Sequence, residues 1–195
     1  YGRVSRYGLI AMASSLDQIG PFTRTVADAA LVLEVIAGAD PRDATAVAVP
    51  VPSYRQEISR PIKGLRLGVP KEYYSDDTVA GLEPGVKEVF DTALRHLEEL
   101  GADLVWDVRL PHTEYALPVY YVVMPAELSS NLARYDGMRY GMSRRGAPTL
   151  VEQYAATRGE GFGPEIRRRI MLGTYALSAG YYEAYYRKAQ AVRTL

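Results

Sequence analysis

A chain of 195 residues that is 48% hydrophobic can bury one medium-sized core, and nothing marks two comparable halves. Its 23 Lys and Arg residues balance its 23 Asp and Glu residues, so net charge gives no argument for binding DNA or RNA, although a local basic face remains compatible. The absence of cysteine excludes disulfides and thiolate chemistry, and no apolar run approaches a membrane span. We therefore expect a soluble, cytoplasmic protein.

Hydrophobic periodicity in the first half predicts alternating helices and strands. The predicted elements are a helix over 25–36, a strand over 65–70, a helix over 83–100 and a strand over 102–108. Gly38 and Gly101 follow the two helices, where glycine commonly ends a helix. Strand, helix and strand within about forty residues indicate a βαβ-like unit, which predicts an α/β layer structure.

The residues after 111 are predicted to form helices and loops. Pro118 fits the first position of a helix in which Pro125 causes a kink. Thr149 and Glu152 have the spacing of a capping box. Pro164 opens a last long helical region, which we expect to continue to the end of the chain.

These patterns predict a single domain over 1–195, with an α/β part over 1–111 and a mostly helical part over 112–195. Tyr1 is not an initiator methionine, and the last residues, YYRKAQAVRTL, stop within a helical pattern. We therefore expect a partial domain that is truncated at both ends.

The stretch SSLDQIGPFTR, residues 14–24, contains serines that could act as nucleophiles or could belong to a turn. A serine nucleophile needs a base such as histidine or a lysine of lowered pKa within hydrogen-bond reach. His96 and His112 lie on a wetter helix face and in a loop, so we favour solvated structural roles for both. The alternative that we prefer is that Ser14 and Ser15 end a strand while Asp17 binds backbone amides.

Metal and phosphate chemistry have little support in the sequence. There is no HExxH motif, and the acidic pairs Asp76-Asp77 and Glu98-Glu99 are predicted to lie on a loop and a helix surface. Neither type of glycine-rich phosphate loop occurs. We therefore predict no metal site.

Arg169 is the most informative charged residue. On a helix whose apolar side includes Ile166 and Gly173, Arg169 borders the buried stripe, where a guanidinium needs a polar or anionic partner. One interpretation is a salt bridge with a carboxylate such as Glu127 or Glu160, which the pattern alone favours. The other is a receptor for a substrate carboxylate, with Gly173 leaving room one turn along the helix.

A second mixed stripe lies on the helix that we expect to begin at Pro118. Tyr120, Met124, Glu127 and Asn131 share one helical face. Such a face suits the wall of a pocket, but hydrogen bonding between helices is the more common explanation.

Several segments together resemble one family of enzymes. The first thirty residues, YGRVSRYGLIAMASSLDQIGPFTRTVADAA, are similar to a segment of the amidase signature family. Three later segments resemble the A subunits of the aspartyl/glutamyl-tRNA amidotransferases within that family: SSNLARYDGMRYG, EGFGPEIRRRIMLGTYALSAGYYEAYY and AQAVRTL. The resemblance implies the amidase signature fold, a mixed β-sheet core covered by helices.

The resemblance also implies where the chemistry lies. The family hydrolyses amides with a Ser, cis-Ser, Lys triad, which would lie upstream of Tyr1, so no catalytic residue is assigned here. The 195 residues are then expected to be inactive alone. Tyr120 matches the tyrosine that lines the glutamine pocket, and Arg169 matches the arginine that binds the glutamine α-carboxylate, which reverses our preference for a salt bridge.

The implied reaction is glutamine hydrolysis that supplies ammonia for amidating Glu-tRNA(Gln) or Asp-tRNA(Asn). A partner, the B subunit, would bind the charged tRNA and use ATP with Mg²⁺, and a small C subunit would brace the pair, so this chain itself would bind no cofactor. Two alternatives remain open: part of a stand-alone amidase acting on another small amide, and a non-catalytic interaction module.

Overall fold

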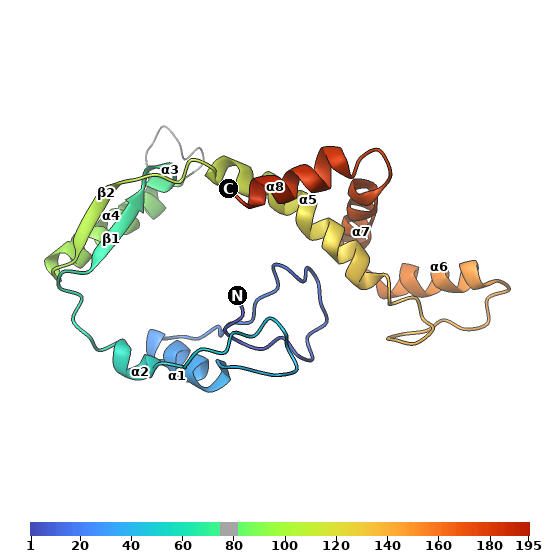
Figure 1. Cartoon of the computed structure of the whole chain (residues 1–195), viewed down its shortest axis with the longest axis horizontal. Coiled ribbons are helices and arrows are strands. Elements are labelled where there is room, and N and C mark those ends of the chain that lie inside the picture. Colours follow the sequence, from blue (N-terminus) through green and yellow to red (C-terminus); the bar gives the residue numbers. More distant parts are fainter. Residues whose placement is uncertain (75–81) are drawn as a thin grey trace. The chain divides into compact units, whose positions relative to one another are not determined.

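The computed structural model describes residues 1–74 and 82–195 (Figure 1). These residues divide into two compact units. Unit 1 comprises Tyr1–Pro21, Ile36–Val51 and Tyr115–Leu195, and unit 2 comprises Phe22–Val35 and Pro52–Glu114. The pair Asp76-Asp77 lies outside the described residues. The expectation of one domain over 1–195 stays a prediction.

Unit 2 contains the predicted strand-helix-strand arrangement. Its elements are most of α1 (Val26–Ile36), α2 (Tyr54–Glu57), β1 (Arg66–Pro70), α3 (Lys71–Tyr74), α4 (Pro84–Glu99) and β2 (Asp103–Val108). β1 and β2 pair in parallel, with Arg66 opposite Asp103, and α4 connects them (Figure 1). Gly101 has a φ of +90°, a conformation that glycine adopts without strain, and it turns the chain from α4 into β2. The predicted βαβ-like unit is confirmed.

Unit 1 is built on α5 (Thr113–Leu132), which enters it at Tyr115. The prediction that this helix begins at Pro118 is wrong, because Pro118 and Pro125 both lie inside α5. Each proline removes one intrahelical hydrogen bond; Pro125 is fully buried, whereas Pro118 is exposed. Residues 123–126 are buried, and the first half of α5 lines an apolar groove together with α8 (Lys188–Arg193).

The core of unit 1 joins α5, α7 (Pro164–Leu177) and a loop near the N-terminus. Ala13, Met124, Leu128 and Leu132 form the buried cluster, with Tyr120, Tyr135, Phe162, Ile166 and Ile170 packed against it. Gly173 of α7 is buried against α5, because a Cβ placed on it would lie 1.8 Å from the carbonyl oxygen of Pro125. The apolar side predicted for this helix is therefore the side that packs.

Of the two helix predictions made for the C-terminal half, the capping box is confirmed and the long helical region is wrong in detail. The capping box is confirmed at α6 (Leu150–Gly161): Thr149 Oγ1 accepts from the Glu152 N–H at 3.2 Å, and the Glu152 carboxylate accepts from the Thr149 N–H at 3.0 Å. The continuous helical region from Pro164 is wrong in detail, because α7 ends at Leu177 and Gly180 has a φ of +86°. A π-helical turn over Glu183–Arg187 then leads into α8.

Within the described residues, the helices are all too short or too polar to cross a lipid bilayer.

Candidate functional site

The loop around Ser14 is held by its own aspartate. Asp17 accepts hydrogen bonds from the backbone N–H groups of Met12 at 2.9 Å and Ala13 at 3.0 Å, as predicted. The predicted strand before the serines does not form; instead the N–H groups of Leu16 and Asp17 both donate to the Ala13 carbonyl in a tight turn. Ala13 is fully buried in the core of unit 1, so this loop is anchored rather than loose.

Both serine hydroxyls are engaged by neighbouring helices. The Ser15 hydroxyl donates to the Glu127 carboxylate of α5 and accepts from the Arg193 guanidinium of α8 at 2.6 Å. The Asn131 side-chain amide donates to the Ser14 hydroxyl at 2.9 Å. These partners are a carboxylate, a guanidinium and an amide rather than an imidazole, so the geometry supports a structural role. The serines fasten the loop to α5 and α8.

The two histidines, both in unit 2, are exposed. His96 lies 3.3 Å from Glu99 on α4, and its side chain is 74% exposed. His112 precedes α5. Their exposure agrees with the solvated roles that the sequence favours.

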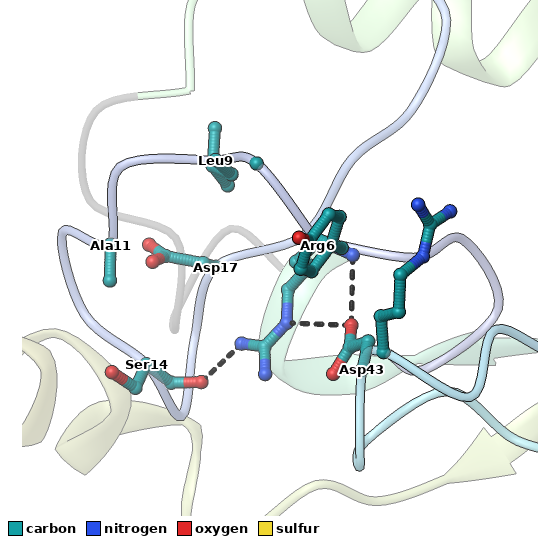
Figure 2. A pocket seen from close by; sticks show the side chains of 9 residues that line it. Arg6, Leu9, Ala11, Ser14, Asp17 and Asp43 are labelled. Carbon is teal, nitrogen blue, oxygen red and sulfur yellow. Dashed lines mark hydrogen bonds and ion pairs between the residues drawn. The ribbon is translucent and has the colours of Figure 1, made fainter.

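A polar cavity of about 270 Å³ lies beside the Ser14 loop (Figure 2). Its lining residues are Arg6, Tyr7, Gly8, Leu9, Ala11, Ser14, Asp17, Arg42 and Asp43. The Arg6 guanidinium donates to the Ser14 carbonyl and, at 2.8 Å, to the Thr45 hydroxyl. The backbone N–H of Arg6 donates to the Asp43 carboxylate at 2.8 Å. Arg6 Nε also forms an ion pair with Asp43 at 3.6 Å, and the Asp17 carboxylate is occupied by backbone amides, so we interpret the cavity as a structural junction.

Asp43 should make the stability of this junction depend on pH. The hydrogen bond from the Arg6 N–H, followed by bonds from Thr45, lowers the pKa of Asp43 from 3.8 to about 2. A carboxyl whose pKa is lower in the folded state stabilises the fold above its unfolded pKa, and that contribution is lost as pH falls from about 4 to about 2. Asp43→Asn in the full-length protein should therefore flatten the fall in unfolding free energy over this range.

Denaturant unfolding at several pH values would measure this effect. Asp107→Asn is the matched control, because the Asp107 side chain is 91% exposed and its contact with Lys71 is a surface ion pair. If the unfolding free energy fell equally steeply at acid pH in the Asp43 variant and the parent, the hydrogen bonds to Asp43 would contribute little to stability.

Arg169 and Tyr120 are brought together between α7 and α5. Arg169 Nη1 lies 3.3 Å from the Tyr120 hydroxyl and 3.6 Å from the Met124 sulfur, while Nε donates to Glu165 at 2.7 Å. The Arg169 side chain is 25% exposed, consistent with a position at the border of the buried stripe. Its role in binding glutamine stays a prediction.

The carboxylate that pairs with Arg169 differs from the candidates predicted from the sequence. Glu127 binds Ser15, and Glu160 pairs with Arg144. The partner is Glu165, four residues before Arg169 on the same helix. That spacing was visible in the sequence as an i,i+4 pair.

The Arg169 site offers donors to an anion. Arg169 Nη2 forms no hydrogen bond within the described residues, so its two N–H groups remain available. The Tyr120 hydroxyl accepts from Arg169, which leaves its own proton to donate. A carboxylate could accept hydrogen bonds from Nη2 and also from Nη1, because the contact of Nη1 with the Met124 sulfur is weak. These groups can bind and orient a substrate, but they supply no nucleophile.

Comparison with known proteins places this chain in a family. The amidase family profile matches residues 1–195. The chain is 62% identical over 195 residues to the A subunit of glutamyl-tRNA(Gln) amidotransferase from Chloroflexus aggregans, a match that covers 100% of this chain and 39% of that protein. This chain therefore spans well under half the length of that relative.

Solved structures agree. The crystal structure of the A subunit of glutamyl-tRNA(Gln) amidotransferase from Thermotoga maritima aligns with a TM-score of 0.69 and 46% identity, covering 100% of this chain and 36% of that one. Native peptide amidase from Stenotrophomonas maltophilia aligns with a TM-score of 0.66 and 26% identity, covering 97% and 38%. The predicted α/β amidase signature fold is confirmed, and the chain belongs to the amidase family.

Proposed function

We propose that this chain is the part of a glutaminase subunit that binds the α-carboxylate of glutamine. The observation that carries the proposal is the half-buried Arg169 guanidinium, which Tyr120 and Glu165 hold while Nη2 remains available. Arginine suits this task because its planar donors match the geometry of a carboxylate. The names of the similar A subunits support an amidotransferase that acts on glutamyl-tRNA(Gln), and the resemblance of the sequence implies glutamine as the amide that is hydrolysed.

In this proposal, the whole subunit releases ammonia from glutamine to convert Glu-tRNA(Gln) or Asp-tRNA(Asn) into the amidated product. The serine, serine and lysine of the triad lie outside these 195 residues. The B subunit binds the charged tRNA and uses ATP with Mg²⁺ to activate its carboxylate, and the C subunit completes a heterotrimer in the cytoplasm. The balanced charge of this chain is compatible with that division, because another subunit makes most of the contacts with tRNA.

The similarity to a peptide amidase favours one alternative, in which the whole protein is a stand-alone amidase. Glutamine would then be no better a substrate than other small amides, and the protein would purify without a tRNA-binding partner. A non-catalytic interaction module is the other alternative. It would require the isolated chain to fold and bind a partner subunit.

The isolated 195 residues are expected to release no ammonia from glutamine, because a carboxylate site without a nucleophile cannot cleave an amide. The assay compares ammonia release by the isolated chain with release by the full-length subunit in its complex. Activity in the complex that depends on glutamine would support the proposal. Serine-dependent turnover by the isolated chain would refute it.

A further inference from the structure

We infer that Glu165 is a positioning residue, which fixes the direction of the Arg169 guanidinium and thereby the affinity of the site for a substrate carboxylate. This inference rests on the proposed function and adds a residue to it. It concerns how the arginine is held, whereas the proposed function concerns what the arginine binds.

Glu165 holds two neighbouring arginines with its two oxygens. Oε1 accepts from Arg169 Nε at 2.7 Å, and Oε2 accepts from Arg168 Nη1 at 2.6 Å. Arg168 is 70% exposed whereas Arg169 is 25% exposed, so the carboxylate bridges a solvated cation and a half-buried one. The hydrogen bond from Arg169 holds the pKa of Glu165 below its ordinary value, as expected for a carboxylate that accepts from a guanidinium.

The position of Glu165 in α7 is also favourable. It follows Pro164 in the first turn, where the helix dipole stabilises a negative charge. From there, a residue four positions later lies on the same face, within reach of its side chain. The helix therefore presents the carboxylate to Nε without distortion.

Three contacts fix the guanidinium. Glu165 accepts a hydrogen bond from Nε, while the Tyr120 hydroxyl and the Met124 sulfur both accept from Nη1. Nη2 is then the nitrogen of the guanidinium that remains available to a ligand. A long side chain that is already ordered loses less conformational freedom when the ligand binds, so preorganisation increases affinity.

Loss of the Glu165 contact would free the guanidinium to rotate about several bonds toward solvent. The Tyr120 contact alone, at 3.3 Å, is longer than the Glu165 contact at 2.7 Å and is therefore the weaker restraint. The consequence should be weaker binding of the substrate carboxylate, with little effect on the chemical step, because Glu165 is not proposed to touch the reacting amide.

The test uses three variants of the full-length subunit in its complex, with glutamine as substrate. Glu165→Ala should raise the KM by about tenfold, with kcat changed by less than about twofold. Glu165→Asp keeps the charge but withdraws the oxygens by one methylene, and it should raise the KM by about fivefold. Glu165→Gln keeps an acceptor oxygen at the same reach and should remain within about threefold of the parent.

Glu183→Gln is the matched control, because Glu183 forms an i,i+4 pair with Arg187 at the same distance of 2.7 Å, and both side chains are exposed. Its kinetics should equal those of the parent. Circular dichroism establishes that each variant is folded, and the Asp and Gln variants decide the question even if the Ala variant does not fold.

The outcomes separate this inference from the proposed function. An Asp variant with normal KM, or a Gln variant as impaired as Ala, would overturn positioning in favour of a charge effect. A fall in kcat at constant KM would also overturn it. If Arg169→Lys raises the KM while Glu165→Ala and Glu165→Asp leave it unchanged, only this inference fails; if Arg169→Lys has no effect, the proposed carboxylate site fails as well.

Discussion

Arg169→Lys in the full-length subunit is expected to raise the KM for glutamine by about 10- to 100-fold, with a smaller change in kcat. A hydrogen bond to a charged group contributes about 1.5–3 kcal/mol, and the substitution removes the planar fork that can share a carboxylate between two nitrogens. Lysine retains the positive charge, but its single ammonium cannot contact Tyr120, Glu165 and a ligand in the same directions. The effect is therefore mainly on binding.

Steady-state release of glutamate and ammonia over a range of glutamine concentrations separates KM from kcat. Arg187→Lys is the control, since Arg187 pairs with Glu183 on the surface and its side chain is 71% exposed. A KM within about twofold of the parent for Arg169→Lys would remove the residue from the substrate site. A loss of kcat alone would assign it to the chemical step, contrary to the proposal.

The local signals in the sequence predicted much of the fold. Proline at the start of α4 and glycine after it define the helix within the βαβ-like unit, because both residues act through their own backbone. The capping box at Thr149 and Glu152 is likewise complete within four residues. Such features need no knowledge of distant contacts.

Errors arose where distant packing competes with local preference. Pro118 suits the first turn of a helix, yet α5 begins at Thr113, and Tyr115 and Pro118 of α5 line an apolar groove together with α8. The break after α7 coincides with Gly180, whose conformation a periodicity argument does not register. The pattern of apolar residues therefore predicted which side is buried more reliably than where each helix begins or ends.

In the candidate site, too, the sequence predicted local features better than distant contacts. Helical phase predicted that Arg169 borders the buried side of α7, and resemblance paired it with Tyr120. Its partner Glu165 lies four residues away on the same helix, whereas the sequence-based candidates Glu127 and Glu160 are more distant along the chain. The contact between Ser15 and Arg193 joins residues that are 178 positions apart, and no local signal in one sequence predicts it.

Gly173→Ala is expected to destabilise the full-length protein by about 1–3 kcal/mol, although alanine is ordinarily the better helix former. The added Cβ would lie 1.8 Å from the Pro125 carbonyl oxygen, 2.3 Å from its carbon and 2.9 Å from the Ala126 nitrogen. All three atoms belong to the backbone of α5, so no side-chain rotation relieves the overlap. The two helices must move apart instead.

Gly159→Ala in α6 is the matched control, because its Cβ would meet no atom within 4 Å and the substitution should be neutral or stabilising by up to about 1 kcal/mol. Chemical denaturation measures both variants. Separation of α7 from α5 would also move Arg169 away from Tyr120, so the Gly173 variant should show a raised KM for glutamine in the fraction that remains folded. Unchanged stability in this variant would mean that the close approach of the two helices is not required.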